Sequence, residues 1–137
     1  MHKFTDFKQG ELDIDLAFRL NVKKAIEEYK KETGCDRYFL AMQLSKATNQ
    51  DITKNTIDTW TKTDPKWRFP ANILPAFIKI TGAIWLLDNF AQSCDCSVIS
   101  RSEKNQLKLI NKKQELRSLQ KEIEELEKSF NLQNIQE

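Results

Sequence analysis

The sequence contains little glycine, proline or histidine: three glycines, three prolines and one histidine occur in 137 residues. Strand-like alternation of apolar and polar residues is nearly absent, so the chain is predicted to be mostly helical. The single histidine lies at the terminus, and there is neither a glycine-rich phosphate loop nor a Ser/His/Asp arrangement. We therefore expect a helical protein that is not an enzyme and needs no cofactor.

The net charge is small, and long apolar runs are absent. The formal net charge is only +2, so any contact with a polyanion requires a local basic surface. No apolar segment approaches membrane-spanning length, and no signal-peptide pattern opens the chain. These absences predict a cytoplasmic protein that makes no contact with a membrane.

Cysteine is limited to Cys35, Cys94 and Cys96. The Cys-x-Cys pair together with His2 is one conceivable metal site. Zinc sites, however, normally show two spaced pairs of ligands, whereas here one close pair stands beside a terminal histidine. We expect reduced thiols and no metal.

The first predicted helix has Asp15 as its N-cap and runs to about Thr33, with Gly34 as its stop. Lysines and glutamates at i,i+4 spacing form a solvated outer face, which is typical of a scaffold helix. Its apolar stripe is expected to comprise Leu16, Leu20, Val22, Ile26 and Tyr29. Four preceding apolar residues are candidates to pack on the domain: Phe4, Phe7, Leu12 and Ile14.

Residues 37–82 have the pattern of two short helices, a turn and a third helix that packs against them. Over residues 37–45, the spacing of Phe39, Leu40 and Leu44 predicts one buried face, and small Ala41 allows close approach of a second helix. A long linker over residues 46–53 follows, in which Ile52 is expected to enter the core.

The helix predicted over residues 53–61 has the features of a DNA-reading helix. Thr53 is a suitable N-cap, and Ile57 and Trp60 share one face as anchors. The other positions are polar, as in the second helix of a helix-turn-helix. Amphipathic surface helices show the same pattern, and they are the alternative.

Pro65 is expected to stop this helix, with the basic residues Lys66 and Arg68 close behind. Trp67 and Phe69 are interpreted as core residues rather than as exposed stacking groups. Pro70 then opens a helix that ends at Gly82 and directs Ile73, Leu74, Phe77, Ile78 and Ile80 inward. A further helix, ending near Cys94, carries Ile84, Trp85, Leu86, Leu87 and Phe90, and Val98 and Ile99 are expected to close the domain.

This order of residues resembles phage-encoded helix-turn-helix regulators, namely the lambdoid CII activator type and small regulators of Mu-like transposable phages. The resemblance covers about residues 37–90, and the turn over residues 46–53 is several residues longer than in the CII type. It implies sequence-specific binding of double-stranded DNA and an additional helix that assembles an oligomer. The residues that carry it are Ala41, Ser45, Asn55-Thr-Ile-Asp-Thr-Trp60, Trp67-Arg-Phe-Pro70, Ile73-Leu-Pro-Ala-Phe77 and Gly82.

The resemblance also implies which side chains face DNA. Lys54 suits guanine acceptors, and Asn55 suits the paired donor and acceptor of adenine. Asp58 is expected to pair with Lys54 or Lys62, four residues away on either side, or to accept from a cytosine amino group. Thr56 and Thr59 are expected to contact phosphate or a thymine methyl group. Lys62, Lys66 and Arg68 are expected to contact phosphate. The DNA-facing positions of the helix are Thr53, Lys54, Asn55, Thr56, Asp58 and Thr59. The alternative for each is ordinary solvated surface.

From Ser102 onward the composition changes, and we predict two domains, residues 1–99 and 100–137. The second lacks Gly, Pro and Trp, and its apolar residues follow a heptad pattern that is typical of a coiled coil. Lys112 occupies the first d position. The seam comprises Leu109, Leu116, Leu119, Ile123, Leu126 and Phe130.

Charge along this C-terminal helix is asymmetric. Residues 101–121 hold seven basic and two acidic side chains, and residues 122–137 hold one basic and five acidic. Antiparallel pairing brings opposite charges together and is favoured over parallel pairing. The alternative to pairing is a helix that folds back on its own domain. Separately, the basic first half of the helix is a candidate for a further DNA contact.

The predicted fold class is all-α: a compact helix-turn-helix domain of about five helices followed by a long C-terminal coiled-coil helix. The predicted function is a sequence-specific double-stranded DNA-binding transcriptional regulator of a phage or mobile element. It is expected to act as a homo-oligomer, a dimer or a tetramer, because joining two modules makes the second DNA contact effectively intramolecular. The alternative is a protein-interaction adaptor that self-associates through the coiled coil without binding DNA.

Overall fold

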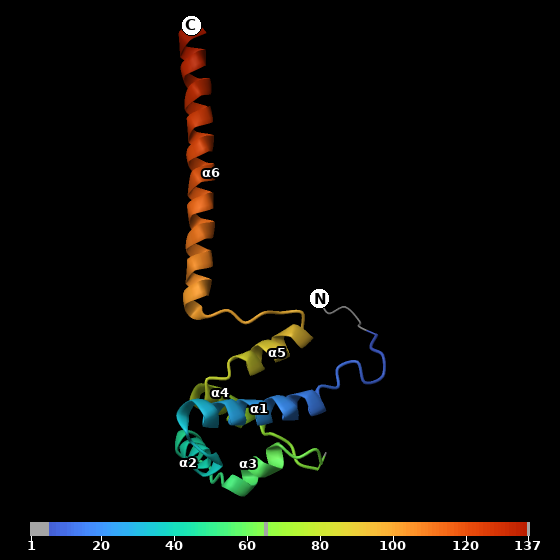
Figure 1. Ribbon diagram of the computed structural model, residues 1–137. Coiled ribbons are helices and arrows are strands. Elements are labelled where there is room, and N and C mark those ends of the chain that lie inside the picture. Colours follow the sequence, from blue (N-terminus) through green and yellow to red (C-terminus); the bar gives the residue numbers. More distant parts are fainter. Residues whose placement is uncertain (1–5, 65, 137) are drawn as a thin grey trace. The chain divides into compact units, whose positions relative to one another are not determined.

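The computed structural model describes residues 6–64 and 66–136, and all regular structure in that part is helical (Figure 1). The all-α prediction with a long C-terminal helix is confirmed. Pro65 lies outside the described residues, and the helix it was expected to stop ends ahead of it. The elements are α1 (Asp15–Thr33), α2 (Arg37–Thr48), α3 (Lys54–Trp60), the 3-10 helix η1 (Ala71–Ile73), α4 (Leu74–Thr81), α5 (Trp85–Ser93) and α6 (Arg101–Gln136).

The chain forms two compact units, Met1–Ser97 and Val98–Glu137. This division lies close to the boundary predicted between residues 99 and 100. Val98 and Ile99 were expected to close the first domain, and that prediction is wrong. Both side chains are exposed, and both residues belong to the second unit.

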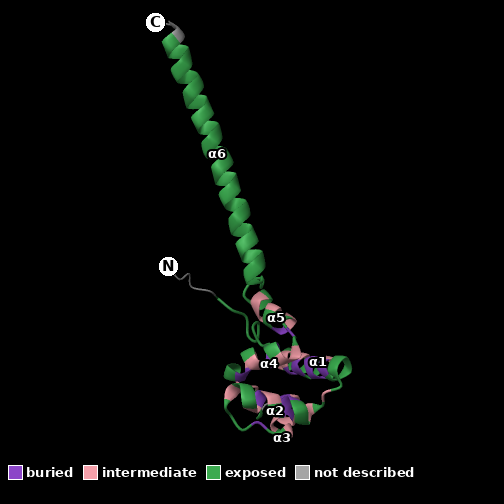
Figure 2. Ribbon diagram, turned by 90° about the vertical axis from the view of Figure 1, so that its left-hand side faces the viewer, coloured by how far each residue is buried: buried purple, intermediate pink, exposed green. Residues whose placement is uncertain are grey.

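The core of the first unit is one cluster of apolar side chains drawn from α1 through α5 (Figure 2). Ala25 of α1 and Ala41 of α2 are buried, and their small side chains let neighbouring helices approach closely. Each large side chain that is fully buried stabilises the fold by roughly 1.5–3 kcal/mol. These side chains are Val22, Leu40, Leu44, Ile57, Ile73, Phe77 and Leu86.

The start of α1 differs from its prediction, whereas its end agrees. Ile14 occupies the N-cap position without a side-chain cap, and Asp15 is already helical. The Asp15 carboxylate binds Arg19 and Arg68 instead. At the other end Gly34 adopts φ 74°, the left-handed conformation that terminates a helix, and its N–H donates to the Lys30 carbonyl.

The buried face of α1 is rotated from the predicted stripe. Leu16 and Leu20 are more than half exposed, whereas Val22, Ile26 and Tyr29 are buried as predicted. At 3.6 residues per turn, the two leucines lie roughly 120–160° around the helix from the centre of the buried face. Of the preceding candidates, Phe7, Leu12 and Ile14 are exposed, and Phe4 lies outside the described residues.

The turn between α2 and α3 is shorter than expected, because α2 continues to Thr48 and only residues 49–53 link the helices. Asn49, at φ 53°, ends α2 in the left-handed region. Ser45 then clamps the turn: its hydroxyl donates to the Ile52 carbonyl at 2.9 Å and accepts from the Ile52 N–H at 3.0 Å. Ile52 is buried as predicted, whereas Phe39, expected on the buried face of α2, is partly exposed.

After a loop, Pro70 precedes η1, and Pro75 lies in the first turn of α4, where a missing N–H is tolerated. Gly82 ends α4 at φ 74° as predicted. In α4 the predicted inward residues Phe77 and Ile78 are buried, as is Ile73 of η1, and Leu74 and Ile80 are half-buried. Around α5 only Leu86 of the predicted set is buried; Trp85 and Phe90 are half-buried, and Ile84 and Leu87 are exposed.

The second unit contains α6, a helix of 36 residues. All of its side chains that the structure describes are exposed (Figure 2). In the part of the chain covered by the structure, none of the helices combines the length and the apolar character needed to cross a membrane.

Candidate nucleic-acid interface

The start of α3 is fixed by a reciprocal cap between two threonines. The Thr56 N–H donates to the Thr53 hydroxyl oxygen at 3.2 Å, and the Thr53 N–H donates to the Thr56 hydroxyl oxygen at 3.3 Å. This capping box satisfies amides that the first turn leaves without helical partners. The prediction of Thr53 as N-cap is confirmed.

One face of α3 is held by two large apolar side chains. Ile57 is fully buried and Trp60 is nearly so. The Trp60 ring lies 4.6 Å from the Phe69 ring between centroids, and Phe69 in turn contacts Phe18 and Phe77. An isolated helix of seven residues is not stable in water, so these two buried side chains determine the direction in which the polar side of α3 points.

The opposite side of α3 is accessible. Thr53 and Asn55 are exposed, and Lys54, Thr56, Asp58 and Thr59 are half-buried. The Thr59 hydroxyl donates to the Thr56 carbonyl at 2.5 Å, so this hydroxyl already has a partner within the helix. Five of the six predicted positions therefore lie in α3 and Thr53 lies at its N-cap, with Asn55 the most open of those suited to base edges.

Asp58 binds two cations, Lys54 within α3 and Arg37 of α2. Its carboxylate lies 2.8 Å from Lys54 Nζ and 2.7 Å from an Arg37 guanidinium nitrogen, and Arg37 also donates to the Thr61 hydroxyl at 3.1 Å. The hydrogen bond from Lys54, aided by Arg37, lowers the pKa of Asp58, and the hydrogen bond to Asp58 raises the pKa of Lys54.

The predicted pairing of Asp58 with Lys54 is confirmed. The second cation is Arg37 and not Lys62, the other residue at i,i+4 spacing. Sequence reasoning did not find Arg37, because this contact spans 21 residues and depends on how α2 packs against α3.

The loop after α3 is held by a buried arginine. Arg19 of α1 is only 3% exposed, and its guanidinium donates to the carbonyls of Lys62 at 2.6 Å, Asp64 at 2.9 Å and Trp67. The Asp15 carboxylate lies 3.3 Å from Arg19 Nε, which balances the buried charge. Sequence analysis missed Arg19; its position three residues before Val22, on the buried face, is the signal that could have found it.

The three basic residues predicted to contact phosphate all lie in this loop. Lys62, Lys66 and Arg68 are exposed. Arg68 lies 2.8 Å from Asp15, the carboxylate that also binds Arg19. The network of Asp15, Arg19 and Arg68 thus fixes the backbone of the loop, while the lysine side chains of the loop remain accessible.

The two aromatic residues of this loop have different environments. Phe69 packs in the core cluster as predicted. Trp67 is 41% exposed, so its predicted place in the core is wrong. Arg19 holds the Trp67 carbonyl while the Lys66 ammonium lies 5.2 Å from the centroid of the Trp67 ring.

A hollow of about 390 Å³ lies between α2 and the start of α3. Tyr38 and Met42 of α2, both exposed, line one side, and Lys54 and Asn55 of α3 line the other. Lys54 Nζ lies 5.9 Å from the Tyr38 ring centroid. Tyr38 and Met42 were not among the predicted site residues, since an exposed apolar side chain on a short helix has no distinctive pattern.

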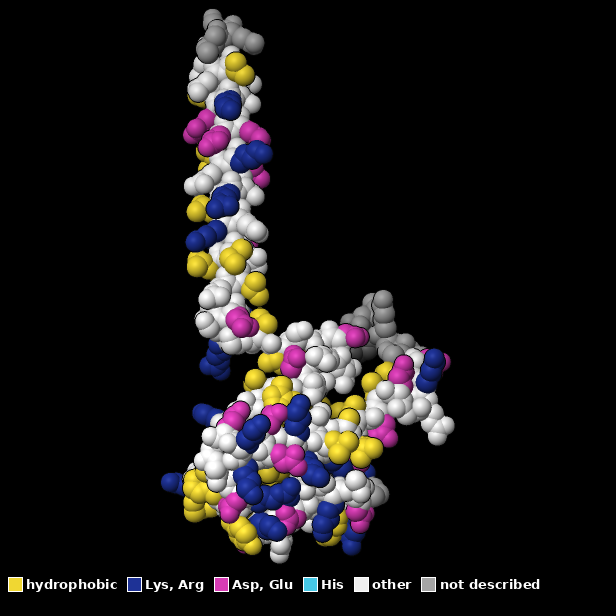
Figure 3. All heavy atoms as spheres, viewed as in Figure 1, with side chains coloured by type: hydrophobic (Ala, Val, Ile, Leu, Met, Phe, Trp, Pro, Cys, Tyr) yellow, Lys and Arg dark blue, Asp and Glu magenta, His cyan; other side chains and the backbone are white. Residues whose placement is uncertain are grey.

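Charge on the first unit is balanced overall, with 14 basic and 13 acidic residues in the range 1–97. Figure 3 shows lysine and arginine side chains interspersed with acidic ones on the face that includes α3. Any attraction to phosphate therefore comes from local groups such as Lys62 and Lys66.

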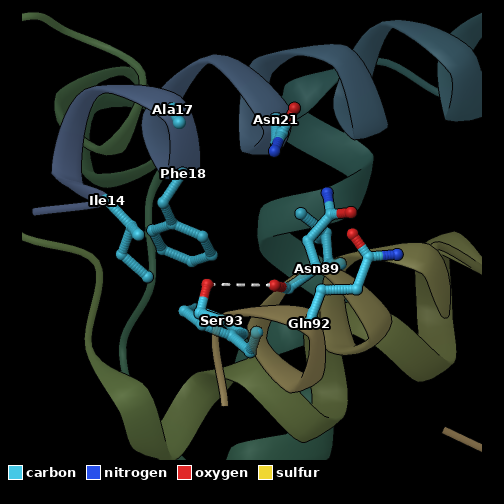
Figure 4. Close-up of a pocket in the computed structure, with 9 residues that line it drawn as sticks. Ile14, Ala17, Phe18, Asn21, Asn89, Gln92 and Ser93 are labelled. Carbon is cyan, nitrogen blue, oxygen red and sulfur yellow. Dashed lines mark hydrogen bonds between the residues drawn. The ribbon is translucent and has the colours of Figure 1, made fainter. Parts of the chain in front are cut away.

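A second hollow, of about 380 Å³, lies between α1 and α5 (Figure 4). Phe18 points into it from α1, and Asn89 and Ser93 face it from α5; the Ser93 hydroxyl donates to the Asn89 carbonyl at 3.3 Å. Its lining is apolar or uncharged polar: Ile14, Ala17, Phe18, Asn21, Leu86, Asn89, Phe90, Gln92 and Ser93. Such a lining offers packing and hydrogen bonds rather than acid–base chemistry.

The three cysteines are free thiols, with Cys35 half-buried and both Cys94 and Cys96 exposed. Within residues 6–64 and 66–136, there is no group of three His, Cys, Asp or Glu side chains placed to hold a metal ion. His2, the other residue considered for a metal site, lies outside the described residues.

Comparison with protein-family models, with curated proteins and with solved structures finds no match to this chain.

Proposed function

We propose that this protein is a sequence-specific double-stranded DNA-binding regulator that acts as an oligomer. The observation that carries the proposal is the presentation of α3. Its apolar side is anchored by Ile57 and Trp60, and its polar side with Lys54 and Asn55 is accessible. Such a helix suits the major groove, where lysine and asparagine read base edges.

The loop of residues 61–69 supports this proposal independently. Lys62 and Lys66 lie on a backbone that the buried Arg19 holds in place, so two cations stand at the exit of α3. Cations on a held backbone beside a base-reading helix contact phosphates and set the register of that helix on the DNA. The resemblance of residues 37–90 to phage regulators extends the proposal to regulation of transcription in a phage or mobile element.

A duplex-binding measurement tests the proposal. The wild-type protein and a Lys54→Ala/Asn55→Ala variant are compared on a pool of fragments from the protein's own genomic neighbourhood, at two salt concentrations. The matched control is Asn72→Ala/Lys79→Ala, which removes the same two side-chain types from exposed positions in η1 and α4.

Selective binding by the wild type should weaken by roughly tenfold or more in the α3 variant, since each lost base contact contributes about 1–3 kcal/mol. The control should retain selectivity. Affinity should also fall steeply with salt, as phosphate contacts require. A wild type that binds no fragment even at low salt would overturn the proposal.

A protein-interaction adaptor is the second candidate function, and two observations favour it. The first unit has nearly balanced charge, and Asp58 neutralises Lys54 at the proposed interface. The exposed Tyr38 and Met42 beside α3 offer an apolar surface to a protein partner. In that case, Tyr38→Ala/Met42→Ala should abolish partner binding, and Lys62→Ala/Lys66→Ala should leave it unchanged.

A further inference from the structure

An exposed apolar seam runs along α6. Six residues at heptad a and d positions form this seam, and each is between 53% and 69% exposed. A stripe this narrow on a 36-residue helix is the surface that a second helix covers in a coiled coil. The seam has Leu109, Leu116, Ile123 and Phe130 at a, and Leu119 and Leu126 at d.

Parallel pairing of two copies of α6 would bring like charges together at three levels. Lys112 occupies a d position, so it would face Lys112 of the second copy inside the seam. At the flanking g and e positions, Lys108 would face Lys113, and Glu122 would face Glu127. Like charges at these positions disfavour a parallel pair.

Antiparallel pairing removes all three conflicts, because a residues then face d residues and e residues face e residues. With Leu116 opposite Leu126 of the second copy, Leu119 falls opposite Ile123. Four consecutive layers are then apolar. This register also overlaps almost the whole length of both helices.

The same register gives the polar residues of α6 suitable partners. Lys112 falls opposite Phe130 of the second copy, where its stem covers the ring and its ammonium stays in water. Its ammonium already lies 3.2 Å from Glu115, at the edge of the seam. Lys113 falls opposite Glu127, and symmetry makes this attractive pair twice. The remaining conflict is one facing pair of Glu122 side chains at the centre.

We propose that α6 pairs with α6 of a second copy of this chain in antiparallel orientation, with Leu116 opposite Leu126 and Lys113 opposite Glu127. This proposal specifies how the oligomer of the proposed function forms. It rests on the oligomer part of that function and not on DNA binding. Its test uses no DNA, so failure here is distinguishable from failure of DNA binding.

The experiment is sedimentation equilibrium of the full-length chain, with circular dichroism to check that each variant keeps its helix content. The variants are Lys113→Glu, Glu127→Lys and the combination of the two. The matched control is Lys104→Glu, which makes the same charge change at a c position away from the seam. Both Lys113→Glu and Lys104→Glu also create a Glu-to-basic pair at i,i+4, with Arg117 and Lys108 respectively.

In the antiparallel register, each single variant should raise the dimer dissociation constant by roughly tenfold, since two symmetry-related pairs change from attractive to repulsive. The combined variant should return to within about twofold of the wild type because the pair is restored with its charges exchanged. The control should be unchanged.

In a parallel pair, the same single changes would relieve repulsion and strengthen association, and the combined variant would be the tightest. That result would overturn the proposal. So would a wild type that stays monomeric, as expected for a helix that folds back on its own domain. Single variants that behave like Lys104→Glu would also overturn the proposed register.

Discussion

At the scale of single residues, Arg19 holds the backbone of the loop that follows α3. It is a buried guanidinium that satisfies three loop carbonyls and is itself balanced by Asp15. Removing one member of a buried network leaves the other polar groups without partners, which is costly. Arg19 thus links the scaffold helix α1 to the loop that carries Lys62 and Lys66.

We predict that Arg19→Met lowers the free energy of unfolding by about 2–4 kcal/mol, because the carbonyls of the loop lose their donors. Urea denaturation followed by circular dichroism measures the change. Arg68→Met is the matched control: Arg68 shares Asp15 but is exposed, so its loss should cost less than about 1 kcal/mol. Equal losses in the two variants would contradict a special role for Arg19.

Asp58 makes stability depend on acid pH in a direction set by its lowered pKa. The hydrogen bond from Lys54 and the contact with Arg37 favour the carboxylate, so the pKa of Asp58 in the folded protein lies below its ordinary value of 3.8. As pH falls, the unfolded chain takes up the proton first. The stabilisation is therefore complete above about pH 4 and is lost as pH falls through the folded pKa.

Asp58→Asn should accordingly be less stable than the wild type near neutral pH, by no more than about 1 kcal/mol because the pair is accessible to solvent. The difference should shrink as the pH is lowered toward about 3. Urea midpoints across this range measure it, with the exposed Asp51→Asn as control. A difference that is independent of pH would contradict this account.

At the scale of elements, α3 is a seven-residue helix whose position comes from its cap and its anchors. Helices this short have little stability of their own. The capping box at Thr53 and the Ser45 clamp on Ile52 therefore fix the beginning of α3, while Trp60 fixes its end. The orientation of the polar face of α3 follows from these constraints.

Thr53→Ala should lower the free energy of unfolding by about 1 kcal/mol, since the Thr56 N–H loses its acceptor. Thr53→Ser, which keeps the hydroxyl, should stay close to the wild type. Thr63→Ala, at an exposed loop position, is the control. Thermal and urea unfolding give the comparison. If the alanine and serine variants behaved alike, the cap would not contribute to stability.

At the scale of the whole molecule, the two proposals together lead to an expectation about the separation of DNA half-sites. In the antiparallel register, the Arg101 ends of two α6 helices lie on the order of 60 Å apart, at 1.5 Å rise per residue. One turn of DNA separates half-sites by about 34–36 Å, and two turns by about twice that distance. The span of the paired helices favours the longer separation.

We therefore expect duplexes whose half-sites are two helical turns apart to bind more tightly than duplexes with half-sites one turn, or two and a half turns, apart. The last of these places the second half-site on the opposite face of the DNA. Competition binding on duplexes of fixed half-site sequence measures the preference. In the Lys113→Glu variant, which is expected to associate weakly, the preference should disappear. Tightest binding of the wild type to half-sites one turn apart would contradict the antiparallel arrangement.

The sequence by itself determined the helical class, the stops at Gly34 and Gly82, the N-cap at Thr53 and the apolar seam of α6, because each depends on local conformation or helical period. Only the tertiary structure decided which face of α1 is buried, that Trp67 is exposed, and that Arg19 and Arg37 reach the α3 region. The hydrogen bonds of Arg37 and Arg19 join residues 21 to 48 positions apart, and local pattern carries no information about which distant backbone or carboxylate a side chain will meet.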